Sequence, residues 1–165
     1  MDAVGSDLRE LAGVAAQLVG DSGGEVTADV VHAFHRGRAE VTGFAVSDLA
    51  VVGRSGPALE ALRHALTLGV PHVVLADALA DGVRSIARVS SAGRGSDYEL
   101  AKRLGMPPWK VKRAGSQARG WSEAGLRRAL GVVATLNADV KGAAADPAYA
   151  LEVAVRRIGA ARALH

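Results

Sequence analysis

The stretch of the sequence most suggestive of a binding function is residues 99–114, which read ELAKRLGMPPWKVKRA. Ala101, Gly105 and Val111 have the spacing of a helix-turn-helix, in which the small residue lets two helices approach, the glycine forms the turn and the branched residue locks the second helix. Five side chains would then face a DNA groove, with the cations binding phosphates: Trp109, Lys110, Lys112, Arg113 and Gln117. A tight corner in a helical bundle needs the same three residues. The pattern therefore allows either a DNA-binding motif over residues 99–118 or a structural corner.

No pattern in the chain predicts catalysis. The sequence lacks a phosphate-binding loop of the form GxxxxGK[ST], and the glycines at positions 93 and 95 do not continue into a dinucleotide-binding pattern. There is no cysteine, which excludes disulfides and thiolate zinc sites. The five histidines are scattered, and no nearby carboxylate completes a metal site: His32, His35, His64, His72 and His165. We expect no catalytic residue, no metal and no cofactor.

Charge is distributed unevenly along the chain. Residues 84–128 contain 11 lysines or arginines and three acids, whereas residues 1–83 contain five basic and 11 acidic residues. A basic segment on an otherwise acidic chain suggests an anionic partner, either nucleic acid or an acidic protein surface, although a solvated helix surface has the same composition.

Composition and hydropathy limit the cellular context of the chain. No stretch resembles a signal peptide, and none approaches the roughly 18 uninterrupted apolar residues of a membrane span. These features and the absence of cysteine predict a cytoplasmic protein that does not contact membranes. Apolar residues make up 49% of the chain but aromatic residues only 4%, so the core must consist of small aliphatic side chains.

Helical periodicity and capping signals predict an all-α fold. A serine at position 96 and a glutamate at 99 form a capping box, and the prolines at 107 and 108 fall in the first turn of the following helix. The expected helices cover residues 6–19, 27–37, 45–52, 55–69, 71–86, 96–105, 107–118, 122–140 and 146–158. A domain boundary is expected around Gly53 to Pro57. Gly115, Gly125 and Gly131 fall inside these helices, where each costs about 0.8–1 kcal/mol relative to alanine.

The order of these features resembles the C-terminal half of the delta subunit of the bacterial DNA polymerase III clamp loader, particularly its actinobacterial form. The resemblance covers the whole chain and is most specific over residues 99–122 and 136–152. The stretches that carry it are Val4–Leu11, Glu25–Val30, Phe44–Leu49, Ala58–Ala65, Gly82–Ala87, Glu99–Ser122, Leu136–Gly142, Asp146–Pro147 and Ala150–Glu152. With this resemblance, the helix-turn-helix pattern is better interpreted as a corner of the collar, the helical bundle through which the loader subunits assemble.

The resemblance implies two domains: a three-helix AAA+ lid over residues 1–53 and a helical-bundle collar over residues 57–165. The collar would assemble with the other loader subunits, the ATPase subunit and delta-prime, through the helices that follow Ser122 and Asp146. Arg9 falls where ATP-using relatives place a phosphate-sensing arginine, but without a phosphate loop it would be vestigial.

The implied function is that of a non-catalytic subunit of the DNA polymerase III holoenzyme, which helps load the sliding clamp on primed DNA. Contact with the clamp is expected only through an N-terminal domain that is absent here. The sequence adds the expectation of weak contact with DNA through Lys110, Lys112 and Arg113.

Overall fold

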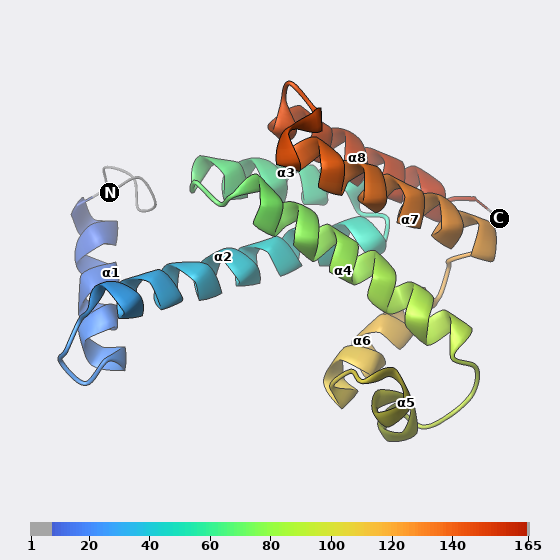
Figure 1. The fold of residues 1–165 in the computed structure, drawn as a ribbon, viewed down its shortest axis with the longest axis horizontal. Coiled ribbons are helices and arrows are strands. Elements are labelled where there is room, and N and C mark those ends of the chain that lie inside the picture. Colours follow the sequence, from blue (N-terminus) through green and yellow to red (C-terminus); the bar gives the residue numbers. More distant parts are fainter. Residues whose placement is uncertain (1–7, 165) are drawn as a thin grey trace.

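The computed structural model describes residues 8–164, leaving aside the side chains of residues 10, 32, 35, 36 and 38. These residues form helices and no strand, which confirms the predicted all-α class. The elements are α1 (Leu8–Asp21), α2 (Ala28–Val51), α3 (Ser55–Thr67), α4 (His72–Ser91), α5 (Asp97–Leu104), α6 (Pro108–Ala118), α7 (Glu123–Ala138), the π-helical turn η1 (Asp139–Ala143) and α8 (Pro147–Arg162) (Figure 1).

Local capping determines where several of these helices begin and where α5 ends. The Ser96 hydroxyl accepts the backbone N–H of Glu99 while the Glu99 carboxylate accepts the N–H of Ser96, so the predicted capping box is formed. Because the Glu99 carboxylate accepts the backbone N–H and the hydroxyl of Ser96, its pKa is lowered. Gly105 ends α5 in the left-handed conformation with φ 61°. Ser122 and Asp146 cap α7 and α8 through their side chains.

The helix predicted to stop near Gly37 and the helix predicted for residues 45–52 are wrong as separate elements. Residues 28–51 form one continuous helix, α2, so the described part of residues 1–53 contains two helices rather than three. The glycines in this segment do not end the helix because a glycine costs only about 1 kcal/mol in a helix interior. At Gly43 the missing side chain also lets α2 approach α4, since a Cβ there would lie 3.1 Å from the Cβ of Ala78.

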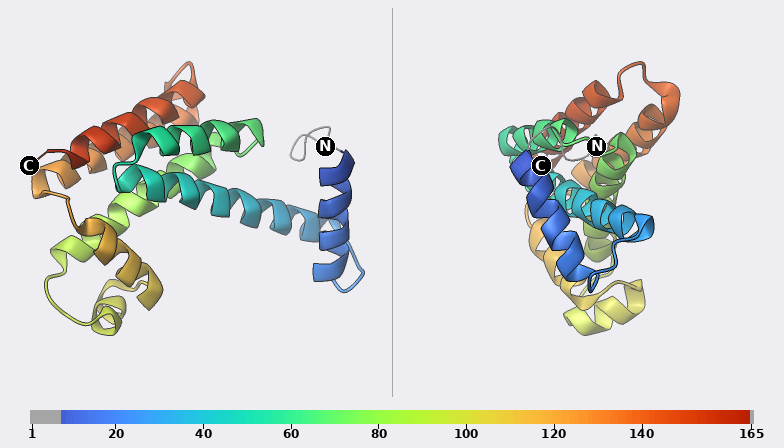
Figure 2. Two further views of the ribbon diagram at one scale, coloured as in Figure 1. Left: turned by 180° about the vertical axis from the view of Figure 1, so that it is seen from behind. Right: turned by 90° about the vertical axis from the view of Figure 1, so that its left-hand side faces the viewer.

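The N-terminal part of the chain forms an arm. Figures 1 and 2 show α1 crossing the far end of α2, away from the other helices. A small apolar cluster joins the two helices, with Val14 and Leu18 buried and Val30, Val31 and Phe34 packed against them. The C-terminal half of α2 instead joins the main core through Val46, Ala50 and Val51. The division into a lid and a collar between residues 53 and 57 stays a prediction.

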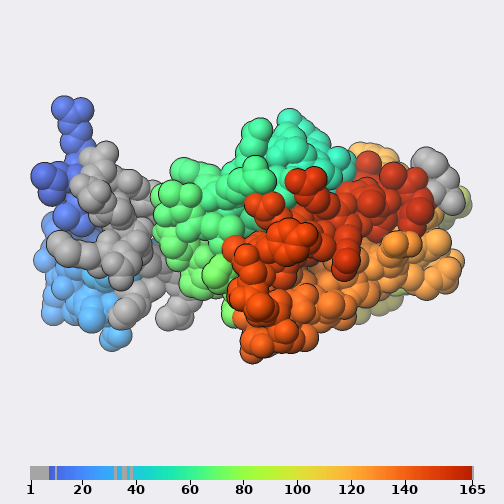
Figure 3. All heavy atoms as spheres, turned by 90° about the horizontal axis from the view of Figure 1, so that it is seen from above, coloured from blue at the N-terminus to red at the C-terminus, as the bar shows by residue number. Residues whose placement is uncertain are grey.

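The main core surrounds α4, which packs against α2, α6, α7 and α8. Its largest fully buried side chains are aliphatic, as the composition predicts: Leu62, Leu75, Leu79, Ile86, Leu136, Leu151 and Ile158. Figure 3 shows α7 and α8 in orange and red beside α3 and the start of α4 in green. α7 and α8 therefore form a large part of the face of the molecule seen in this view.

An ion pair with two hydrogen bonds joins α3 to α8. Arg63 Nε and Nη2 donate to Glu152 Oε1 and Oε2 at 2.9 and 3.2 Å. The hydrogen bond from Arg63 lowers the pKa of Glu152, and the same bond raises the pKa of Arg63.

A carboxylate whose pKa is lowered in the folded state stabilises the fold at pH values above its ordinary pKa. This contribution is lost as the pH falls through the lowered pKa. Replacing Glu152 with glutamine should therefore reduce the free energy of unfolding at neutral pH. The difference from the parent chain should disappear once the pH falls below the lowered pKa. Urea unfolding of both chains from neutral to acidic pH measures this, and a difference independent of pH would show that the charge of Glu152 is not responsible.

Candidate subunit interface

The helices α7 and α8 lie side by side and are joined by a turn of unusual geometry. The turn η1 is π-helical, and Gly142 within it has φ 112°, a conformation that favours glycine. The N–H of Ala144 returns to the carbonyl of Asp139 at 3.2 Å. Asp146 then caps α8 by accepting the N–H of Tyr149 at 2.9 Å. The turn is thus ordered by its own hydrogen bonds, and it closes one end of the helix pair.

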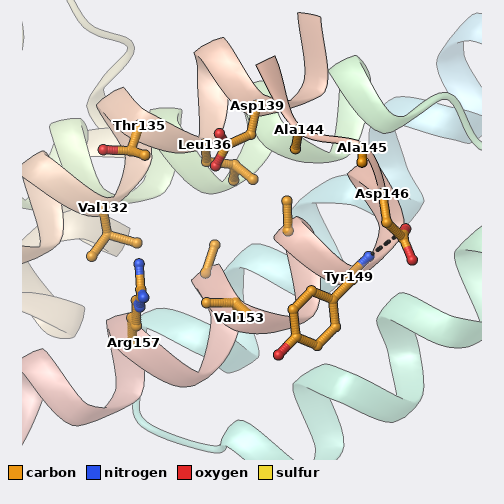
Figure 4. Close-up of a pocket in the computed structure, with 12 residues that line it drawn as sticks. Val132, Thr135, Leu136, Asp139, Ala144, Ala145, Asp146, Tyr149, Val153 and Arg157 are labelled. Carbon is orange, nitrogen blue, oxygen red and sulfur yellow. Dashed lines mark hydrogen bonds between the residues drawn. The ribbon is translucent and has the colours of Figure 1, made fainter. Parts of the chain in front are cut away.

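Between α7 and α8 lies a surface groove of about 380 Å³. Its lining comes from both helices and the turn between them: Val132, Thr135, Leu136, Asp139, Ala144, Ala145, Asp146, Tyr149, Ala150, Val153, Ala154 and Arg157. In Figure 4, Val132 and Leu136 of α7 face Val153 and Arg157 of α8 across this space. The side chain of Tyr149 is 66% exposed at the edge of the groove.

The lining of the groove has the chemistry that is typical of a protein-binding surface. Aliphatic side chains form most of its lining, while Asp139, Asp146 and Arg157 are its charged residues. An apolar depression with a polar edge and an accessible aromatic ring is typical of contacts between proteins. Among the side chains that the structure describes, no group of three or more histidine or acidic residues could hold a metal ion.

The basic corner formed by α5 and α6 has the local geometry predicted from the sequence. Ala101 and Val111 are buried, and Gly105 forms the turn between the two helices. The corner packs mainly on α4 through α6. Trp109 at the start of α6 is 62% exposed.

The structure brings two of the three predicted nucleic-acid contacts together with carboxylates of the same chain. Lys110 Nζ donates to Asp81 Oδ1 on α4 at 2.7 Å, and Arg113 pairs with Asp48 on α2. Asp48 also accepts a hydrogen bond from Gln117 Nε2 at 2.9 Å. This face of α6 is therefore directed toward α2 and α4. Contact of these residues with DNA stays a prediction.

The remaining predicted residues lie apart from this cluster. Lys112 is exposed and makes no ion pair within the described part of the chain. Arg9 lies exposed on α1, in the arm, and its assignment as a vestigial phosphate-sensor position stays a prediction. Neither residue belongs to the α7–α8 groove.

Sequence reasoning pointed to α7 and α8 but not to individual residues of the groove. Periodicity identifies the buried face of each helix, whereas Val132 and Val153 are only partly buried and lie at the border of that face. The carboxylates of Asp48 and Asp81 were also missed as partners of the cations on α6. Asp81 precedes Lys110 by 29 residues, and Asp48 precedes Gln117, which also bonds to it from α6, by 69 residues. No local sequence pattern connects residues so far apart.

Residues 40–158 match the family model described as the DNA polymerase III delta subunit, C-terminal domain. The chain belongs to this family. The matched delta-subunit region begins within α2 and ends within α8, so it contains the helix pair and the groove between them.

A solved structure, the Bacillus subtilis DNA clamp loader delta protein (YqeN), has a similar fold. The TM-score is 0.65 at 21% sequence identity, and the match covers 96% of this chain. It covers 48% of the Bacillus chain, so the present chain spans about half the length of that relative. A search among curated proteins gave no match. In the part of the delta-family chain that the structure describes, no helix is long and apolar enough to cross a membrane.

Proposed function

We propose that this delta-family chain is a non-catalytic assembly module of a bacterial clamp loader, acting in DNA replication. Its helices would form part of the collar that holds the loader subunits together, with the ATPase subunit and delta-prime as partners. Family membership over residues 40–158 supports this role. The single structural observation that carries it is the groove between α7 and α8.

We assign the subunit contact to this groove for three physical reasons. Burying its aliphatic lining in a neighbouring subunit would yield roughly 25 cal/mol for each Å² of apolar surface removed from water. Tyr149 offers a large exposed side chain, and tyrosine is among the residues that most often dominate binding energy at interfaces. The charged groups of Asp139 and Arg157 at the groove can select the orientation of a partner.

The proposal also covers the domains of the chain, its location and its contacts with the clamp and with DNA. Residues 1–53 would be the lid and residues 57–165 the collar, in the cytoplasm. Contact with the sliding clamp would require the N-terminal domain of the family. DNA contact through Lys110, Lys112 and Arg113 would be weak and insensitive to sequence, because Lys110 and Arg113 already pair with carboxylates.

The proposal is tested by light scattering after gel filtration of this chain, alone and mixed with the clamp-loader ATPase subunit of the same organism. A mixed complex of defined mass is expected. Separate elution of both proteins, at protein concentrations well above the dissociation constant expected of a stable complex, would contradict the proposed function.

A further inference from the structure

The surface between α2 and α4 forms a groove that continues beyond the basic corner. Where α6 packs on these two helices, a small cavity of about 60 Å³ remains between them, and its lining includes Phe44 and Asp81. A second groove of about 340 Å³ extends from the same two residues toward the start of α4. Its lining is Glu40, Phe44, Val74, Asp77, Ala78 and Asp81. The two spaces therefore form one surface groove, of which α6 fills one half.

The filled half shows what kind of segment this surface binds. The helix α6 docks on α2 and α4 with Lys110 paired to Asp81 and Arg113 paired to Asp48. Two cations three residues apart on one helix thus reach one carboxylate on each of the two supporting helices. Beside these two cations α6 is held by apolar packing, since Val111 and Ala114 are buried in the main core.

The open half repeats the same chemistry, and the residues that the structure describes do not fill it. Glu40 on α2 and Asp77 on α4 are exposed carboxylates, and neither forms an ion pair within the described residues. Phe44, which is 40% exposed, and the half-buried Val74 line the same groove. Val41 and Val73 extend the exposed apolar surface along the same stretches of α2 and α4. The groove thus presents apolar side chains together with one carboxylate of α2 and one of α4 that form no ion pair within the described residues.

We propose that this open half is a docking site for a short basic amphipathic helix of a partner protein. Two lysines or arginines three or four residues apart would pair with Glu40 and Asp77, as Lys110 and Arg113 pair with Asp81 and Asp48. An apolar side chain between the two cations would cover Phe44 and Val74. The site lies apart from the α7–α8 groove, and the inference does not depend on that groove being a subunit interface.

The probe is a fluorescein-labelled, end-blocked 18-residue helix of alanine with leucines on one face and two lysines three residues apart beside them. A second peptide carries glutamine in place of each lysine. Fluorescence anisotropy at low salt, titrated with the 165-residue chain, measures the affinity of both. The basic peptide is expected to bind more tightly, and to weaken as salt is raised. Equal affinity of the neutral peptide would overturn the charge pairing and with it the proposal.

Two variants locate the binding. The double substitution Glu40→Gln/Asp77→Asn should weaken the basic peptide about fivefold, the value expected for two exposed ion pairs. Phe44→Ala should weaken both peptides, because it removes an apolar side chain of the groove. A matched control, Glu60→Gln/Asp97→Asn, removes two exposed carboxylates on α3 and α5 and should leave the affinity unchanged. An equal loss in the control would show general attraction to acidic surface and would overturn the site.

Discussion

Replacing Leu79 with alanine is expected to lower the free energy of unfolding by about 2–5 kcal/mol, the range for removing a fully buried leucine side chain from a core. Leu79 is fully buried on α4, the helix on which α2, α6, α7 and α8 pack. Since a domain of this size is stable by only about 5–15 kcal/mol, the loss is a large part of the total.

Urea unfolding followed by circular dichroism measures the effect of Leu79→Ala. The matched control is Val73→Ala on the same helix, where the side chain is 37% exposed. This control should change the unfolding free energy by less than about 0.5 kcal/mol. A loss below about 1 kcal/mol for Leu79→Ala would contradict the arrangement in which α4 forms the centre of the core.

The second large effect is expected at Gly125, near the start of α7. A Cβ at this position would lie 2.5 Å from the backbone carbonyl oxygen of Ala161 on α8 and 3.2 Å from the hydroxyl of Ser122. Backbone cannot move aside as a side-chain tip can, so the two helices must separate. Replacing Gly125 with alanine should therefore cost about 1–3 kcal/mol of stability, as overpacking of a well-packed core does.

Gly131 on the same helix gives the matched comparison. It is exposed, and a Cβ there would meet no atom within 4 Å. Gly131→Ala should therefore stabilise the chain by about 0.8–1 kcal/mol through helix propensity alone. Thermal and urea unfolding of both variants measure the two changes. If Gly125→Ala stabilised the chain as Gly131→Ala does, the close approach of α7 and α8 would be contradicted.

These two glycines illustrate what the sequence alone could predict. Helix propensity assigns the same cost to Gly125 and Gly131, because it considers only the helix that contains them. The structure separates them, since the backbone of α8 lies against Gly125 and solvent against Gly131. Tertiary contacts of this kind involve a residue 36 positions away, and no local pattern reveals them.

Helix boundaries were predictable where capping is local and were missed where it is not. Ser96, Ser122 and Asp146 each accept a backbone N–H three residues ahead, so the signal lies within one turn of the chain. The continuity of α2 was missed because Gly37 resembles a helix stop, whereas a helical glycine costs only about 1 kcal/mol, and at Gly43 the missing side chain allows packing against Ala78 of α4. Gly37 lies in the same helix with no neighbouring atom within 4 Å of its missing Cβ, so a glycine by itself does not mark the end of a helix.

The candidate sites also contain features that the sequence predicts and features that depend on tertiary packing. The order of motifs along the chain indicated α7 and α8 as contact helices, and the same order indicated the delta-subunit family that the match over residues 40–158 shows. The residues of the groove, such as Tyr149 and Val153, depend on how α8 is rotated against α7. The partners of Lys110 and Arg113 depend on the placement of α6 over α2 and α4, which the charge distribution did not reveal.

Assembly through the α7–α8 groove is tested most directly by a pair of double variants. Tyr149→Ala/Val153→Asp changes the groove, while Tyr98→Ala/Ala160→Asp changes exposed residues on α5 and α8 outside it. The affinity of each chain for the clamp-loader ATPase subunit is measured by isothermal calorimetry, and circular dichroism verifies that both variants remain helical. The groove variant should bind at least about tenfold more weakly, as expected when an interface aromatic is removed, while the control should bind like the parent chain. Equal binding by the two variants would contradict the assignment of this groove as the subunit interface.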